Sequence, residues 1–132
     1  MPKPLLLFPN LLDPNIEHIF IPLCEDLLDN QIQKLCEQVA DHLEHVYAAL
    51  GRNEFIDVSV AEQIAERLTI LLNEITTIPE TKRRLVVGAA RYFVQDRDAQ
   101  ADLSSILGFD DDLIVLNYVL TELGRQNLKV DA

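Results

Sequence analysis

Glycine is scarce in this sequence, with four residues among 132, and no glycine-rich loop occurs. Neither the dinucleotide-binding pattern G-x-G-x-x-G nor the phosphate-loop pattern G-x-x-x-x-G-K-[ST] is present. The sequence therefore gives no support for a standard nucleotide-binding site. The length fits one domain that can bury about two-thirds of its unfolded surface, so we expect it to fold without a disulfide or a structural metal.

Basic residues are also few: 11 lysines and arginines stand against 22 aspartates and glutamates, for a net charge of −11. A nucleic-acid-binding protein needs clustered basic residues to neutralise phosphates, so this balance argues against such a partner. A strongly acidic chain can instead bind a basic protein or a metal ion, or use its charge to stay in solution. We favour solubility as the explanation for most of the charge.

The chain has two cysteines, Cys24 and Cys36, and they form no C-x-x-C pattern, so the usual zinc and thioredoxin-like motifs are absent. If both lie on one helix, their separation corresponds to an axial rise of about 18 Å, which is too long for a disulfide. Two free thiols are typical of a protein in a reducing cytoplasm.

Long hydrophobic runs are absent as well. The apolar stretch Leu5–Phe8 near the N-terminus is cut short by Pro9, Asn10 and Pro14. No small-residue cleavage site follows it, and a membrane-spanning helix needs about 20 apolar residues. We therefore expect neither a signal peptide nor a membrane span, and we expect a cytoplasmic protein.

The prolines divide the chain into an N-terminal arm, residues 1–22, and a helical bundle domain, residues 23–132. Five of the six prolines fall in the arm: Pro2, Pro4, Pro9, Pro14 and Pro22. They exclude a long helix there, although Asp13-Pro14 is typical of the start of one short turn. The arm is rich in leucine, isoleucine and phenylalanine, so we expect it to pack on the helices or on a second subunit.

Apolar residues in the second part recur at the 3.6-residue period of helices. The expected helices span about residues 23–50, 59–76, 77–95 and 110–123. In the first, the inward stripe is formed by Leu28, Ile32, Leu35, Val39, Leu43, Val46 and Leu50. Short connections between successive helices favour an antiparallel arrangement. The sequence thus predicts an all-α fold, an antiparallel bundle of about four helices with a packed N-terminal arm.

Local signals mark where these helices begin and end. Ser59 and Thr77 each precede a glutamate by three residues, which is the capping-box pattern of a helix N-terminus. Gly124 predicts the end of the last helix. Gly88 lies inside the third helix, and we expect it to let a neighbouring segment approach closely.

Two groups of chemically active side chains have simple explanations. His42 and His45 lie about one helical turn apart, as metal ligands often do, but no second helix offers a matching histidine, so we expect both to be solvated at the surface. Five basic residues are gathered in sixteen positions: Lys82, Arg83, Arg84, Arg91 and Arg97. We expect them to balance neighbouring carboxylates.

No serine or cysteine lies in a nucleophile motif, and acidic neighbours disfavour a thiolate at either cysteine.

The densest group is acidic, with six aspartates in seventeen residues: Asp96, Asp98, Asp102, Asp110, Asp111 and Asp112. Carboxylates this close repel one another unless something neutralises them, and hard cations prefer oxygen ligands. The spacing does not fit an EF-hand, because Ala101 and Leu107 occupy the positions of its glycine and glutamate. One alternative is helix capping with salt bridges, and the other is a site for a divalent cation or a basic partner. The candidate binding residues are Asp98, Asp102, Asp111 and Asp112.

This segment resembles the YkvA-like family, small bacterial proteins of unknown function, over about residues 85–120. The shared features are a tyrosine near a helix end, two spaced aspartates, a glycine with an aromatic after it, and an aspartate pair that opens a helix: Tyr92, Asp98, Asp102, Gly108, Phe109, Asp111 and Asp112. Asp96, Ala101 and Ser105 stand where the family has prolines, so this loop should be less rigid. The resemblance implies a helical fold and no known reaction.

Three functions remain as hypotheses. The first is a small non-enzymatic protein that binds a protein partner or associates with itself as a homo-oligomer. The second is a metal-dependent enzyme that uses the loop from Asp98 to Asp112. The third is an acidic immunity or inhibitor protein directed against a basic toxin or nuclease. A divalent cation is the one cofactor that the sequence suggests, and nucleic acid is not expected as a partner.

Overall fold

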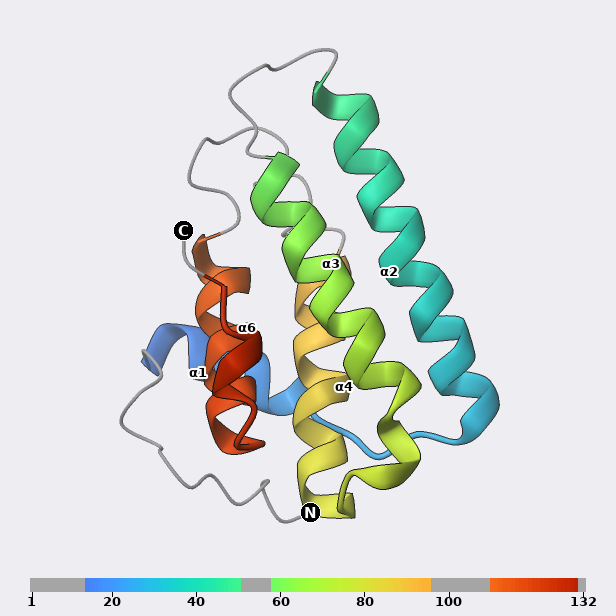
Figure 1. Ribbon diagram of the computed structural model, residues 1–132, viewed down its shortest axis with the longest axis vertical. Helices are drawn as coiled ribbons and strands as arrows, with labels where there is room; N and C mark the ends of the chain where they lie inside the picture. Colours follow the sequence, from blue (N-terminus) through green and yellow to red (C-terminus); the bar gives the residue numbers. More distant parts are fainter. Residues whose placement is uncertain (1–13, 51–57, 96–109, 131–132) are drawn as a thin grey trace.

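The computed structural model describes residues 14–50, 58–95 and 110–130. Within these residues the chain forms α-helices joined by turns and short 3-10 segments, and no strand is present (Figure 1). The α-helices are α1 (Pro14–Phe20), α2 (Asp29–Leu50), α3 (Val58–Asn73), α4 (Glu80–Val94) and α6 (Asp110–Glu122). The 3-10 segments are η2 (Ile21–Leu23), η3 (Ile75–Thr77) and η4 (Gln126–Leu128). The predicted all-α fold is confirmed.

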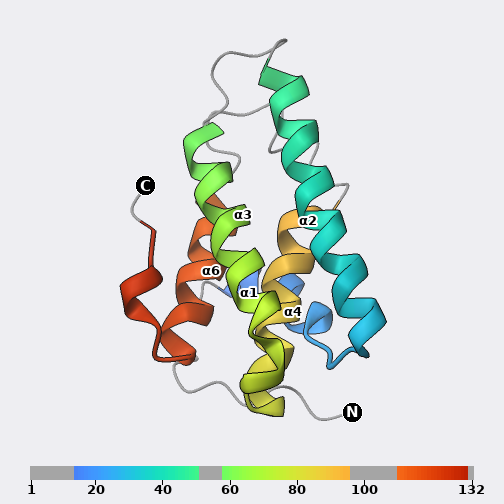
Figure 2. The same ribbon diagram turned by 45° about the vertical axis from the view of Figure 1, so that its right-hand side comes forward.

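The four longest helices run antiparallel, each opposite in direction to the one before it. In Figure 1, α2 rises, α3 descends, α4 rises and α6 descends. α2 packs on α3 and α4, and α6 packs on α4 and α3, so α4 contacts every other long helix. α1 lies across α4 and α6 and closes the bundle on that side (Figure 2). This explains why six successive residues of α4, 85–90, are all buried.

The described part of the N-terminal arm packs on the helices. Ile16 and Phe20 of α1 belong to the common core, and Phe20 is fully buried. Gly88 of α4 makes this packing possible, because a Cβ atom there would lie 2.4 Å from Cys24 Sγ and 2.7 Å from Phe20 Cε1. The predicted close approach at Gly88 is therefore confirmed, and the approaching segment is the arm with the turn that follows it.

The first long helix begins later than predicted, at Asp29 instead of Leu23. The backbone N–H of Leu28 donates to Gln31 Oε1 over 2.9 Å. This bond is one half of a capping box, in which a side chain in the first turn satisfies the N–H of the residue before the helix. Leu28, predicted to face the core, is instead 70% exposed, because it lies outside the helix and off its apolar stripe.

Both predicted capping boxes are wrong. α3 begins at Val58, so Ser59 already lies inside the helix, and its carbonyl accepts a hydrogen bond from Gln63 Nε2. Thr77 ends η3, and its hydroxyl donates to the carbonyl of Glu74 over 2.7 Å. Hydroxyl side chains readily bond to nearby backbone groups, and here that local bond takes the place of a cap. Pro79 precedes α4 without a side-chain cap.

The last helix ends where Gly124 predicted. Gly124 has a φ of 72°, in the left-handed region that glycine adopts at little cost. Its N–H donates to the carbonyl of Thr121, and the N–H of Arg125 donates to the carbonyl of Leu120. These two bonds form a Schellman motif, which turns the chain back along the bundle. The turn places Arg125 beside the connection between α3 and α4.

Candidate functional site

The two aspartates in the first turn of α6, Asp111 and Asp112, lie on different sides of the helix. Asp111 is exposed, whereas Asp112 is buried in the bundle. Consecutive residues of a helix are separated by about 100°, so such a pair divides between surface and interior. Both stand in the first turn of α6, where a carboxylate stabilises the positive end of the helix dipole. Asp98 and Asp102, the other two candidate residues, lie outside the described residues, so the predicted site stays a prediction.

The described residues bring together no group of three histidine, cysteine, aspartate or glutamate side chains that could hold a metal ion. His42 and His45, like the two aspartates, differ in burial. His45 is exposed, as predicted, but the prediction for His42 is wrong. Its side chain is buried, and its ring meets Phe93 edge-on with centroids 4.7 Å apart. The signal was its position between Val39 and Val46 on the apolar stripe of the helix.

The basic cluster of α4 is neutralised, as predicted, at each of its four described members. The ion pairs are Lys82–Glu122 at 3.2 Å, Arg83–Asp26 at 3.0 Å, Arg84–Glu80 at 3.3 Å and Arg91–Glu25 at 3.1 Å. The hydrogen bonds from Arg83 hold the pKa of Asp26 below its usual value. Arg97, the fifth member, lies outside the described residues. The ion pairs therefore fasten α4 to neighbouring segments.

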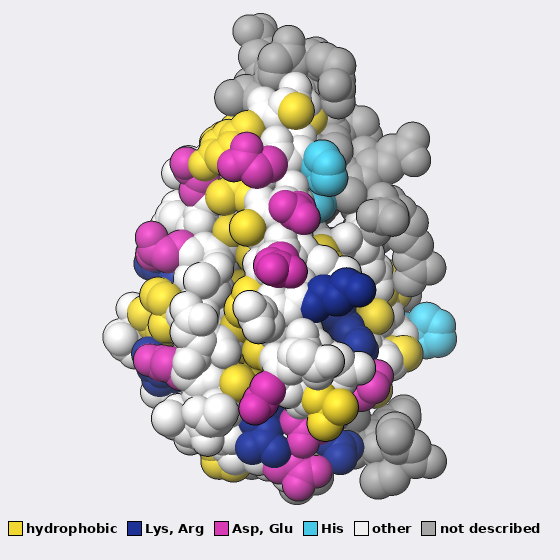
Figure 3. Space-filling model, turned by 90° about the vertical axis from the view of Figure 1, so that its right-hand side faces the viewer, with side chains coloured by type: hydrophobic (Ala, Val, Ile, Leu, Met, Phe, Trp, Pro, Cys, Tyr) yellow, Lys and Arg dark blue, Asp and Glu magenta, His cyan; other side chains and the backbone are white. Residues whose placement is uncertain are grey.

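The acidic side chains of α2 present the opposite situation. This helix carries four acidic residues and one lysine. Glu37, Asp41 and Glu44 follow one another at helical spacing and are all exposed, and we call these three the acidic ridge. None of the three forms an ion pair with another described residue. Figure 3 shows acidic side chains running down the upper half of this face, with lysine and arginine beside and below them.

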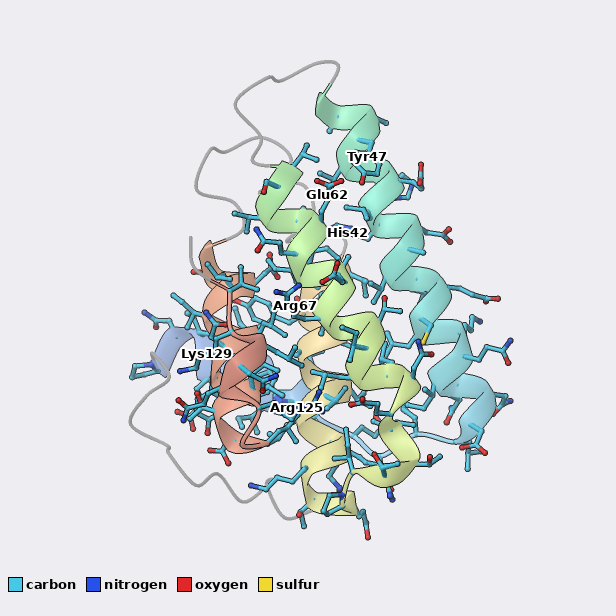
Figure 4. All side chains as sticks on the ribbon, in the orientation of Figure 1. His42, Tyr47, Glu62, Arg67, Arg125 and Lys129 are labelled. Atoms are coloured by element: carbon cyan, nitrogen blue, oxygen red, sulfur yellow. The ribbon has the colours of Figure 1, made fainter. Side chains whose placement is uncertain are left out.

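A tyrosine stands at the end of the acidic ridge. Tyr47 is partly exposed, and its hydroxyl donates to Glu62 Oε2 of α3 over 2.7 Å (Figure 4). This bond and the nearby charges of Glu62 and Glu44 raise the pKa of Tyr47, because they favour the protonated phenol. The bond ties α2 to α3, so the aromatic ring is held in one position at the surface.

A small polar depression adjoins the acidic ridge. It has a volume of about 160 Å³ and is lined by Gln38, Asp41, His42, His45 and Val94. Asp41 thus belongs both to the ridge and to the wall of the depression. The carboxylate, amide and imidazole groups offer hydrogen-bond acceptors and donors at one point of the surface. The arrangement suits recognition of a polar or cationic group.

The two cysteines offer no reactive thiolate. Cys24 is buried in the turn after η2, not on the first long helix, and burial raises the pKa of its thiol to about 12. Burial also raises the pKa of Cys36, with a smaller contribution from the charge of Glu37. Burial is thus the larger cause of the raised pKa at both cysteines, and an acidic neighbour contributes only at Cys36, because the charge of Arg91 lowers the pKa of Cys24.

The chain matches no protein-family model, and neither a curated protein nor a solved structure is found to match it. The likeness to the YkvA-like family therefore stays a prediction. Of the residues that carry it, Tyr92 is buried in α4 and the pair Asp111 and Asp112 opens α6, while the loop between them lies outside the described residues. In the described part of the chain, no helix combines the length and the apolar character needed to cross a membrane.

Proposed function

We propose that this protein is a non-enzymatic interaction module that binds a basic segment of a partner protein through the acidic ridge. The partner is a lysine- or arginine-rich segment, because Glu37, Asp41 and Glu44 present three carboxylates along one helix. Complementary charge of this kind speeds encounter and selects among partners. The proposal places the protein in the cytoplasm, where its two thiols remain reduced.

The uneven distribution of ion pairs is the observation that carries this proposal. Every described arginine, together with Lys82, is paired with a carboxylate of this same chain. These pairs account for acidic residues on α3, on α4, on α6 and in the turn before α2. The carboxylates of the ridge lack such partners among the described residues, so their mutual repulsion is relieved when an external cation binds.

Tyr47 and the polar depression supply contacts that charge alone cannot. An exposed aromatic ring can contact the apolar stem of a lysine or the plane of an arginine. The depression beside Asp41 can receive the head of such a side chain. Because the Tyr47–Glu62 bond fixes the ring, little side-chain freedom is lost on binding.

An immunity or inhibitor protein against a basic toxin is one form of the same proposal, since its target would also bring positive charge to the ridge. Self-association through the ridge is disfavoured, because two identical acidic ridges repel each other. The metal-dependent enzyme receives no support from the described residues, in which no group of three ligands assembles.

The test compares two triple variants of equal net charge. Glu37→Gln, Asp41→Asn and Glu44→Gln neutralise the ridge, whereas the control neutralises three exposed carboxylates that form ion pairs: Glu25→Gln, Glu66→Gln and Glu80→Gln. Each set changes the net charge from −11 to −8, that is, −11 + 3. Affinity for a synthetic lysine-rich helical peptide is measured by calorimetry, and retained proteins are identified after affinity capture from native lysate.

We expect the ridge variant to bind the peptide at least tenfold more weakly than wild type, and the control within about twofold, since surface ion pairs contribute little. A basic protein retained by wild type and control but lost by the ridge variant identifies the natural partner. Equal loss of affinity in both variants would show that net charge alone governs binding, and the proposal would then be wrong.

A further inference from the structure

A second cleft lies where α4 begins and α6 ends. Figure 1 shows both of these helix ends at the bottom of the bundle, whereas α2, which carries the acidic ridge, ends at its top. It has a volume of about 330 Å³, which is at the lower end of the range for small-molecule sites. Ile78, Pro79 and Leu123 form an apolar wall. The rest of the lining is Thr77 and three charged side chains: Lys82, Glu122 and Arg125. Two segments about 40 residues apart in sequence thus build one cleft.

Lys82 is held at this cleft by a buried carboxylate. The side chain of Glu122 is 0% exposed, and its Oε1 lies 3.2 Å from Lys82 Nζ, whose side chain is 20% exposed. Leaving Glu122 without this cation would strand a charge in the interior, so the ammonium is confined to one place. An ammonium carries three N–H donors, and Glu122 is its one hydrogen-bond acceptor among the described residues. Lys82 therefore keeps donors available on its exposed side.

Arg125 supplies the second cation. The Schellman motif at Gly124 brings it to the connection between α3 and α4, where its NH1 donates to Glu74 Oε2 over 2.7 Å (Figure 4). Both side chains of this pair are more than a third exposed, so water or a ligand can replace the bond at low cost. A guanidinium has five N–H donors, and among the described residues Glu74 is the one acceptor of a hydrogen bond from Arg125.

The start of α4 adds to the positive potential of the cleft. Pro79 precedes the helix with no side-chain cap, and the amides of Lys82 and Arg83 donate to the carbonyl of Pro79. Glu80 and Thr81, the first two helical residues, are exposed, and their amides lie at the positive end of the helix dipole. The dipole and the two side chains thus favour the same charge of ligand.

We propose that this cleft binds a small organic anion. Its carboxylate or phosphate head accepts hydrogen bonds from Lys82 and Arg125, and its apolar body lies against Ile78, Pro79 and Leu123. The proposal is independent of the acidic ridge, because it uses other residues at the other end of the bundle. Glu122 serves as a positioning residue, which holds the ammonium of Lys82 and does not touch the ligand.

Four probes with eight carbons each separate charge from apolar contact: octanoate, octyl phosphate, octanol and octylammonium. Each is titrated into the full-length, isotope-labelled protein, and amide shifts near Ile78 and Leu123 are followed by NMR. We expect both anions to bind, octanol at least tenfold more weakly, and octylammonium not at all. The tighter of the two anions identifies the head group as a carboxylate or a phosphate.

Arg125→Gln removes a cation that lines the cleft, and Arg84→Gln removes a neighbouring surface cation that does not. We expect Arg125→Gln to weaken anion binding at least fivefold and Arg84→Gln to change it less than twofold. Both side chains are partly exposed, 28% for Arg84 and 35% for Arg125, so both variants should fold. Binding of octanol as tight as octanoate, an equal effect of the two substitutions, or no anion-induced shift in this region would each overturn the proposal.

Discussion

The side-chain amide of Asn117 holds the backbone of Val130 with two hydrogen bonds. Asn117 Nδ2 donates to the carbonyl of Val130 over 2.8 Å, and the N–H of Val130 donates to Asn117 Oδ1 over 2.9 Å. Arg67 of α3 adds a third bond to this segment, from Nε to the carbonyl of Leu128. Side chains of α3 and α6 thus fasten Leu128, at the end of η4, and Val130 to the bundle.

Asn117→Leu should lower the free energy of unfolding by about 1–3 kcal/mol, because two hydrogen bonds are lost and the backbone groups of Val130 lose their partners. Urea unfolding measures the change, with Asn127→Leu at an exposed position as the control. Hydrogen exchange at the amide of Val130 should accelerate in the first variant alone. The same loss of stability in both variants would show that the paired bonds do not anchor this segment.

Gly88→Ala should destabilise the fold by about 1–3 kcal/mol, because the added methyl group meets Cys24 and Phe20 in a closely packed core. Cys24→Ala should relieve part of this cost by removing the nearer atom, so the two substitutions should not be additive in a double-mutant cycle. Thermal unfolding of both single variants and the double variant gives the coupling. If the two stability changes simply add, the strain caused by Gly88→Ala does not come from contact with Cys24.

Removing one member of the buried pair Lys82–Glu122 should lower the free energy of unfolding more than replacing both members with apolar residues. Lys82→Met alone should lower stability by about 3–5 kcal/mol, since it leaves an uncompensated carboxylate in the interior. The double variant Lys82→Met with Glu122→Leu should recover most of that loss, because the charge is removed and the volume is kept. Urea unfolding of the three proteins tests this order of stability. A double variant no more stable than Lys82→Met would contradict it.

Stability should fall in acid partly through Asp26. The hydrogen bonds from Arg83 lower the folded-state pKa of this carboxyl below its ordinary value of 3.8. Its contribution is therefore fully present above the unfolded-state pKa and is lost as the pH falls through the lower, folded-state value. Unfolding free energies of wild type and Asp26→Asn should converge as the pH is lowered below about 4. A constant difference between the two down to pH 2 would rule out this linkage.

Periodicity alone was enough to predict the fold. The apolar stripes of α3, α4 and α6 gave their positions to within a few residues, because burial of one face determines where such helices form. Local hydrogen bonds were harder to predict. The start of α2 depends on Gln31 reaching back to Leu28, and the hydroxyl of Thr77 bonds backward to Glu74 instead of capping α4. Several short-range partners compete for each polar side chain, and spacing does not choose among them.

The candidate sites depended on contacts that are distant in sequence. The spacing of Glu37, Asp41 and Glu44 is visible in the sequence. That no described residue forms an ion pair with them became visible only after the partners of the described arginines were known. The cleft at Lys82 brings this residue together with Glu122, 40 positions away in the sequence, so no local motif predicts it. His42 shows the reverse case, since the helical stripe already marked it as a core position.

Cys24 makes the packing of the N-terminal segment measurable in time. Thiol reagents attack the thiolate, and burial keeps this thiol protonated and covered by Phe20 and α4. It can be modified only while α1 and η2 are lifted away from Gly88. Cys36, only partly buried on α2, supplies a reference rate within the same molecule. The rate at which Cys24 is modified, relative to Cys36, therefore measures how often α1 and η2 move away from α4, without any added label or engineered residue.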